Sequence, residues 1–283
     1  MTWLILALCA ALTEGALVVE RKRLVGNATP FQLAFIQGAI SAVCFGALLP
    51  FVWRSDVDLS LWGLILARSL LDALAMVLMF VALERDEASR VMPITALTPL
   101  CIVGIELATT GHVPTMLGFA GIATIVLGAF LLMRGVKKET GLHITPGMLP
   151  MLIVTLLWSG ASVIHTVVTH KTGALFYLGT SQVLILLLLV VYGSVWKRIT
   201  LGQFALAPFR KNMSIGLLAT ATQSFQMFAQ SIAPLASYVL ALKRTSLLFG
   251  MVGSGYLLKE KIEHRVIPTL LLTGGAVLVL LFG

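Results

Sequence analysis

Two opposite charges stand inside one long apolar run of this sequence. In "ILARSLLDALAMVLMF", residues 65–80, Arg68 and Asp72 are four positions apart, which places both side chains on one face of a helix. A charge at the centre of a bilayer costs on the order of 3 kcal/mol. Two interpretations remain open: a structural ion pair that fixes helix packing, or a polar wall that faces a water-filled substrate cavity.

A stripe of amides lies in a second apolar run, "SIGLLATATQSFQMFAQSI". Gln223, Gln226 and Gln230 are spaced by three and four positions, so their side chains share one helix face. They form hydrogen bonds to a neighbouring helix, worth roughly 1 kcal/mol each in a membrane, or they line the cavity opposite Arg68 and Asp72. We predict cavity lining and substrate binding.

Glu14 is an acidic residue in the first apolar run, six residues before the flank "ERKR". A rise of 1.5 Å per residue places it roughly 9 Å inside the boundary. Burial disfavours the charged form of a lone carboxylate, so Glu14 is a candidate proton-coupling group. The alternative is an ion pair with Arg68 or Lys243.

Lys243 and Arg244 interrupt the ninth apolar run about eight residues after its start. Adjacent helical residues point roughly 100° apart, so we expect at most one of them to face the cavity squarely. Together with Arg68, a second cation there favours an anionic or zwitterionic substrate. Trp158 lies in the middle of its run, where it either contacts substrate or packs against lipid or core.

The elements that must position these residues are membrane helices. The chain of 283 residues is 58% hydrophobic and 11% charged, with a mean hydropathy of +0.99. Continuous apolar runs of roughly 20 residues are typical of membrane-spanning helices, since helices satisfy the backbone in lipid. We therefore predict an all-α integral membrane protein with ten transmembrane helices, at 2–19, 31–53, 60–83, 88–108, 115–133, 148–169, 173–196, 213–232, 235–257 and 265–282.

The two halves of the chain resemble each other. "TEGALV" at 13–18 can be laid over "WSGASV" at 158–163, and "LGAFLL" at 127–132 over "GGAVLV" at 274–279. Nearly constant offsets indicate an internal duplication. We predict two five-helix repeats, joined by a polar linker, with these bounds: 1–135, 136–147 and 148–283. Because five is odd, the repeats have inverted topology, which places a substrate site near the midplane between them.

Charge in the loops bears on orientation rather than on a polyanionic partner. The formal net charge is +8, and most of the basic residues follow odd-numbered helices. The positive-inside rule then places these loops in the cytoplasm and both termini outside. No motif for nucleotide hydrolysis, zinc hydrolysis or an acidic metal cluster occurs, so we predict no cofactor, no metal, no catalytic residue and no nucleic-acid partner.

The pattern resembles the drug/metabolite transporter superfamily, in particular its ten-helix members with two EamA-type repeats. The resemblance rests on three stretches: "LLWSGASVI", "ASRVMPITALTPL" and "LKRTSLLFGMVGSGYLLKEKI". It implies a multi-pass protein of the plasma (inner) membrane, monomeric or homodimeric. A first-helix glutamate couples protons in the small multidrug resistance members, which supports that role for Glu14. Relatives often carry a proline in the fourth and ninth helices and keep both termini in the cytoplasm. Here Pro93 and Pro99 should bend the fourth helix, whereas the ninth has no proline.

The predicted function is secondary active transport by alternating access, with a proton as the candidate coupling ion. The substrate is a small polar or amphiphilic metabolite that is amino acid-like, zwitterionic or anionic. Two other functions are weighed: an exporter of cationic drugs or quaternary amines coupled through Glu14, and an integral-membrane lipid-modifying enzyme. The predicted binding residues are Glu14, Arg68, Asp72, Trp158, Gln223, Gln226, Gln230, Lys243 and Arg244.

Overall fold

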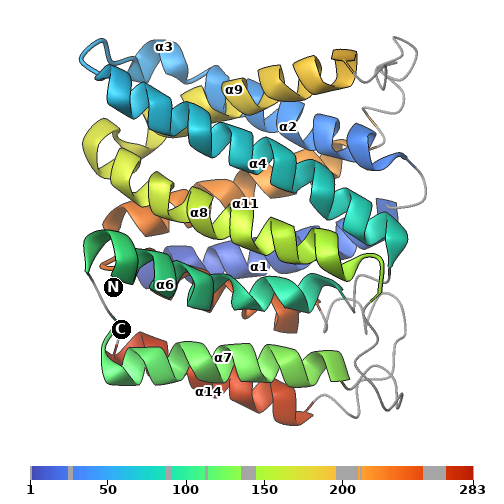
Figure 1. Cartoon of the computed structure of the whole chain (residues 1–283), viewed down its shortest axis with the longest axis vertical. Helices are drawn as coiled ribbons and strands as arrows, with labels where there is room; N and C mark the ends of the chain where they lie inside the picture. The colour runs from blue at the N-terminus through green and yellow to red at the C-terminus, as the bar shows by residue number, and fades with distance from the viewer. Residues whose placement is uncertain are drawn as a thin grey trace.

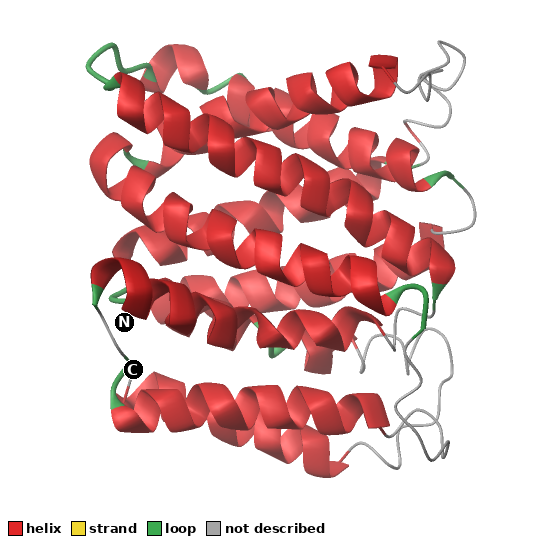
Figure 2. Cartoon of the chain, viewed as in Figure 1, coloured by secondary structure: helices red, strands yellow, loops and turns green. Residues whose placement is uncertain are grey.

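Every element in the described part of the chain is a helix (Figure 2). The computed structural model describes residues 2–24, 28–86, 91–111, 114–134, 145–195, 210, 212–250 and 266–282. The helices are α1 (Thr2–Leu24), α2 (Pro30–Gly46), α3 (Leu49–Val52), α4 (Leu59–Arg85), the 3-10 helix η1 (Met92–Leu97), α6 (Thr98–Thr110), α7 (Met116–Arg134), α8 (Met148–Thr172), α9 (Ala174–Val195), α11 (Met213–Ile232), α12 (Ala236–Lys243) and α14 (Val266–Phe282).

Each of the ten apolar runs contains at least one of these helices. Four helices are long and apolar enough to cross a membrane on length and composition: α1, α4, α8 and α9. Shorter apolar helices occupy four further runs, at Pro30–Gly46, Ile94–Thr109, Met116–Gly128 and Leu270–Val279. An all-α membrane protein is therefore confirmed, while the count of ten spans stays a prediction. The linker predicted at 136–147 lies outside the described residues except for its last three.

The fourth and ninth runs do not form continuous α-helices. In the fourth run, η1 carries Pro93 and gives way at Leu97–Thr98 to α6, which has Pro99 in its first turn. A proline removes a backbone donor and disfavours regular α-helix before it, which accounts for the 3-10 segment ahead of α6. The bend itself stays a prediction. In the ninth run, α12 ends at Lys243, a turn follows at 244–245, and residues 246–250 are helical again. The ninth helix is therefore broken without a proline.

The helices pair across the two halves of the chain. α4 packs along α8, α1 along α11, α2 along α9 and α7 along α14, while α6 meets α12. Figure 1 shows α7 and α14 side by side at one end of the molecule and α2 with α9 at the other, and both chain ends on the same side. α7 and α14 approach each other closely, because a Cβ built on Gly121 would lie 2.9 Å from the carbonyl oxygen of Gly275. Glycine permits this approach.

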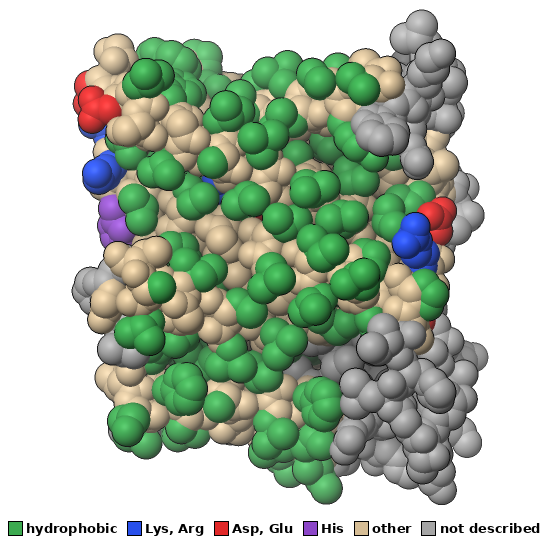
Figure 3. Space-filling model, viewed as in Figure 1, with side chains coloured by type: hydrophobic (Ala, Val, Ile, Leu, Met, Phe, Trp, Pro, Cys, Tyr) green, Lys and Arg blue, Asp and Glu red, His purple; other side chains and the backbone are tan. Residues whose placement is uncertain are grey.

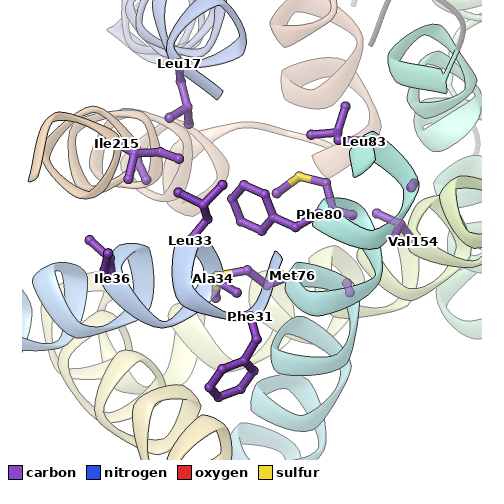
Figure 4. Close-up of a cluster of buried hydrophobic side chains, with 14 of the residues drawn as sticks. Leu17, Phe31, Leu33, Ala34, Ile36, Met76, Phe80, Leu83, Val154 and Ile215 are labelled. Atoms are coloured by element: carbon purple, nitrogen blue, oxygen red, sulfur yellow. The ribbon is translucent and has the colours of Figure 1, made fainter. Parts of the chain in front are cut away.

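Apolar side chains form both the outer surface and the packed core. Figure 3 shows hydrophobic side chains across the middle of one face, with charged groups mainly at its two opposite edges. This distribution suits a protein surrounded by lipid. Inside, Leu17 of α1, Leu33 of α2, Phe80 of α4 and Ile215 of α11 meet in one buried cluster (Figure 4). These four helices, together with α8 and α12, carry the polar residues described next.

Candidate functional site

A polar cavity of about 100 Å³ lies between the two halves of the chain. It is near mid-height, because Glu14, Asp72 and Gln223 lie close to the midpoints of α1, α4 and α11. The ionisable side chains that line it are Glu14, Arg21, Arg68, Asp72, His165, Lys243 and Arg244. The other lining residues include Gln37, Met76, Met92, Trp158, Ser162, Thr222, Gln223, Gln226 and Met227.

Glu14 is bound by two cations. Its Oε1 accepts a hydrogen bond from Nη1 of Arg21 at 3.0 Å, and its Oε2 lies 3.1 Å from Nζ of Lys243. Nη2 of Arg21 also donates to Oε1 of Gln37 at 3.3 Å. Arg21 follows Glu14 by seven residues, which is two helical turns, so both side chains lie on one face of α1. Of the two partners named as alternatives from sequence, Lys243 pairs with Glu14 and Arg68 does not.

Arg68 and Asp72 form the ion pair that their spacing allows. Nη2 of Arg68 lies 2.5 Å from Oδ2 of Asp72, and the two side chains are 4% and 13% exposed. The guanidinium carbon is 5.4 Å from the centroid of the Tyr177 ring, a distance typical of a cation–π contact. Arg68 and Asp72 both belong to α4 and both line the cavity. The structural ion pair and the polar cavity wall, offered as alternatives from sequence, are therefore compatible.

The glutamine stripe meets Lys243. Nζ of Lys243 donates to Oε1 of Gln226 at 2.6 Å, and Nε2 of Gln226 donates to Oε1 of Gln230 at 3.2 Å. Gln223 and Gln226 line the cavity, whereas Gln230 is fully buried behind Gln226 and is absent from the lining. Gln230 therefore orients Gln226 rather than reaching the cavity itself.

Arg244 joins the two broken helices. Its Nη1 donates to Oγ1 of Thr95 at 3.0 Å and its Nη2 to Oγ1 of Thr98 at 2.7 Å. Thr95 lies within η1, and Thr98 is the first residue of α6. Both Lys243 and Arg244 line the cavity, although we expected at most one of them to face it squarely. Arg244 keeps right-handed helical dihedrals, and its N–H donates to the carbonyl oxygen of Leu240, so the two long side chains reach the cavity from different directions.

Eight of the nine residues predicted from sequence line one cavity, and Gln230 is the exception. Whether they bind substrate stays a prediction. Sequence reasoning missed Arg21, Gln37 and His165. Arg21 had been assigned to a basic loop, although its spacing of seven from Glu14 was available as a signal. In the described part of the chain, no group of three His, Cys, Asp or Glu side chains could hold a metal ion.

A glycine beside Glu14 sets the approach of α1 to the ninth helix. A Cβ built on Gly15 would lie 2.6 Å from Cβ of Phe249 and 3.0 Å from the backbone nitrogen of Gly250. Neither atom is the end of a flexible side chain, so the helices would have to separate. The contact holds α1 close enough for Glu14 to reach Lys243.

Gly15→Ala should therefore lower the thermal stability of the purified protein, because overpacking of a tight contact costs typically 1–3 kcal/mol. The matched control is Gly160→Ala, at the position of α8 that the sequence repeat aligns with Gly15. A Cβ there would meet only Cδ1 of Leu71, at an ordinary 3.7 Å. Equal melting temperatures for the two variants would contradict the close approach.

Comparison with known proteins supports the resemblance drawn from sequence. Residues 1–134 match the model of the EamA-like transporter family. A solved structure titled "Crystal structure of protein" has a TM-score of 0.75 and 16% identity, and covers 98% of this chain and 96% of its own. That likeness shows the fold alone. No curated protein matches the chain. The resemblance to the drug/metabolite transporters is confirmed, and the family match with the apolar helices indicates a multi-pass membrane protein.

Proposed function

We propose, from the match of residues 1–134 to the EamA-like transporter family, that this chain is a secondary transporter of the inner membrane with ten spans. It moves a small metabolite of net negative charge by alternating access. The observation that carries the proposal is the polar cavity between the two halves, at mid-height and lined by side chains from both. Transporters built from inverted repeats bind their substrates in such a position.

The helix contacts support the inverted repeat. In the repeat, α1, α2, α4, α6 and α7 correspond in this order to α8, α9, α11, α12 and α14. Under this exchange the α4–α8 contact becomes the α11–α1 contact, and the α2–α9, α6–α12 and α7–α14 pairs are unchanged. The break at Leu97–Thr98 recurs 147 positions later, at 244–245, which agrees with the offsets of the sequence matches. Ser159, aligned with Glu14, likewise contacts the broken helix of the opposite half, through the carbonyl oxygen of Thr98 at 3.4 Å.

The charges around the cavity favour an anion. Four cationic side chains and two carboxylates line it, so the described lining carries two excess positive charges when all six groups are ionised. Buried charge without a counter-charge is costly, and an anionic group on the substrate would offset that cost. The same excess repels cationic drugs and quaternary amines, which removes support from the exporter hypothesis.

The size of the cavity limits the substrate. A water molecule needs at least 10–15 Å³ of such space, so about 100 Å³ corresponds to roughly seven to ten water-sized positions. This volume suits a metabolite of about the size of an amino acid or a short dicarboxylate. Trp158, Met76 and Met227 supply apolar contacts beside the ionic groups.

The test is counterflow in proteoliposomes that contain the purified protein. Radiolabelled L-glutamate, succinate and benzoate are offered outside, with the same compound unlabelled inside, and L-glutamine, succinamide and benzamide serve as matched neutral or less anionic probes. We expect saturable accumulation of at least one anion above its amide. Current that rises linearly with voltage would indicate a channel, and chemical conversion of the probe without accumulation would indicate an enzyme; either result would overturn the proposal.

Proton coupling is tested at Glu14. The charged groups around it are Arg21 on α1, Lys243 at the end of α12, and Arg244, which follows Lys243. If Glu14 takes up the transported proton, Glu14→Gln should remove the pH dependence of transport and leave the protein folded. Initial rates between pH 5.5 and 8.5 measure this. A variant that keeps the pH profile of the unaltered protein would exclude Glu14 as the coupling group.

A further inference from the structure

We propose that Glu14 is a built-in counter-ion that competes with the anionic group of the substrate for Lys243. In the empty cavity the Glu14 carboxylate neutralises Lys243, and the incoming anion takes its place there while Arg21 keeps Glu14. This inference rests on the proposed function and deepens it, because it identifies which cation receives the substrate.

The first step is the imbalance around one carboxylate. Glu14, Arg21 and Lys243 have side chains that are only 10%, 5% and 13% exposed, so solvent offers little compensation for their charges. Each oxygen of Glu14 contacts a different cation, at 3.0 and 3.1 Å. In the part of the chain that the structure describes, Arg21 and Lys243 form no ion pair with any other carboxylate. One negative charge therefore serves two buried positive charges.

The two cations are not equivalent. Arg21 is held by Glu14 and also by the side chain of Gln37 on α2, so it can keep Glu14 without help from Lys243. Lys243 instead reaches from the end of α12 to Gln226 on α11, which also lines the cavity. Lys243 therefore lies between the carboxylate and the glutamine stripe, where a ligand in the cavity can reach it.

Once the substrate displaces Glu14 from Lys243, the remaining ion pairs define a positively charged site. Arg21 with Glu14 is neutral, and Arg68 with Asp72 is neutral. Lys243 and Arg244 then remain as the cations not matched by a carboxylate among the described lining residues. Arg244 is bound to two neutral hydroxyls and follows Lys243 directly at the helix break. A carboxylate or phosphate group near these two residues would complete the charge balance.

If Glu14 competes with the substrate for Lys243, its removal has a measurable effect on anion binding and transport. Removing the charge of Glu14 should tighten binding of anions, because they no longer displace a bound carboxylate. It should also slow the return of the empty carrier, because Lys243 would then face the cavity without a counter-charge. Anion exchange persists in this case, whereas net uptake into empty vesicles falls.

The experiment measures how L-glutamate, succinate and inorganic phosphate raise the melting temperature of the purified full-length protein. We expect Glu14→Gln to lower the apparent Kd of the anions that bind by about tenfold, equivalent to ~1.4 kcal/mol. Glu14→Asp, which keeps the charge but has a shorter reach toward Lys243, should give a smaller gain. The matched control is Glu20→Gln on the same helix, whose carboxylate binds Ser214 outside the cavity; it should leave the Kd unchanged.

A double variant separates competition from a general change of charge. In the Lys243→Gln background, Glu14→Gln should no longer tighten anion binding. A gain that persists there, or an unchanged or weaker affinity in both Glu14 variants, would overturn the inference while anion transport by the unaltered protein still supported the proposed function. If no anion is transported or stabilises any form of the protein, the proposed function itself fails.

Discussion

Arg68→Ala should leave little folded protein, whereas Arg68→Ala combined with Asp72→Ala should recover much of it. The single variant strands the Asp72 carboxylate in a site where its side chain is 13% exposed. Breaking a buried ion pair by removing one partner costs about 3–5 kcal/mol, a large part of the 5–15 kcal/mol that stabilises a typical domain. The double variant removes both charges, so only packing and the contact with Tyr177 are lost.

Fluorescence-detected size exclusion and thermal unfolding in detergent measure this difference. The matched control is Arg54→Ala, which breaks the exposed pair with Asp56, where the side chains are 43% and 68% exposed. Exposed pairs contribute roughly 0–1 kcal/mol, so this variant should fold normally. Equal losses in the single and double variants at positions 68 and 72 would show that the two charges do not compensate each other.

Arg244→Gln should reduce transport by about 10–100-fold while the protein still folds. Arg244 links Thr95 and Thr98, on either side of the break in the fourth helix, to the break in the ninth. Hydrogen bonds to a charged group contribute about 1.5–3 kcal/mol each, and each 1.4 kcal/mol corresponds to a factor of ten. The predicted loss is that of one bond, because the glutamine amide can still donate to one of the two hydroxyls. The two hydroxyls still donate to the carbonyl oxygens of Met92 and Thr95, so neither is left without a partner and folding should survive.

Initial rates in proteoliposomes, normalised to the reconstituted protein, test this expectation. Arg244→Lys is the informative companion, because it keeps the positive charge but cannot present the two donors of a guanidinium in a fixed geometry. We expect an intermediate rate from it. An Arg244→Gln variant with the rate of the unaltered protein would contradict a role for these hydrogen bonds in transport.

Spacing along single helices could be predicted from sequence, and contacts between helices could not. The intervals of three and four that joined Arg68 to Asp72 and aligned the glutamines follow from helix geometry alone. They identified most of the cavity lining without any knowledge of neighbours. Spacing did not predict the position of Gln230 correctly. This residue lies on the predicted helix face, but it is bound to Gln226 and does not reach the cavity. The packing of neighbouring helices around α11 decides which member of the stripe remains accessible.

Helix ends were the other source of error. The apolar run predicts a first helix that stops at residue 19, whereas α1 continues to Leu24, so Arg21 lies within the helix and turns inward to Glu14. An arginine can be buried at that depth because Glu14 and Gln37 accept its hydrogen bonds. The opposite error occurs at Lys243. The apolar run predicts a ninth helix that continues past this residue, whereas α12 ends there, and the adjacent cations Lys243 and Arg244 both line the cavity. Hydropathy cannot anticipate either case, because both depend on partners from other helices.

The breaks in the fourth and ninth helices have a mechanical consequence. Arg244, at the break in the ninth helix, donates hydrogen bonds to Thr95 and Thr98 in the fourth. A movement of either helix at its break therefore strains these bonds and acts on the other helix. A carrier whose two gates moved independently would leak ions whenever both gates were open. In the alternating-access cycle that we propose, the hydrogen bonds of Arg244 would couple the two segments, so that one gate closes as the other opens.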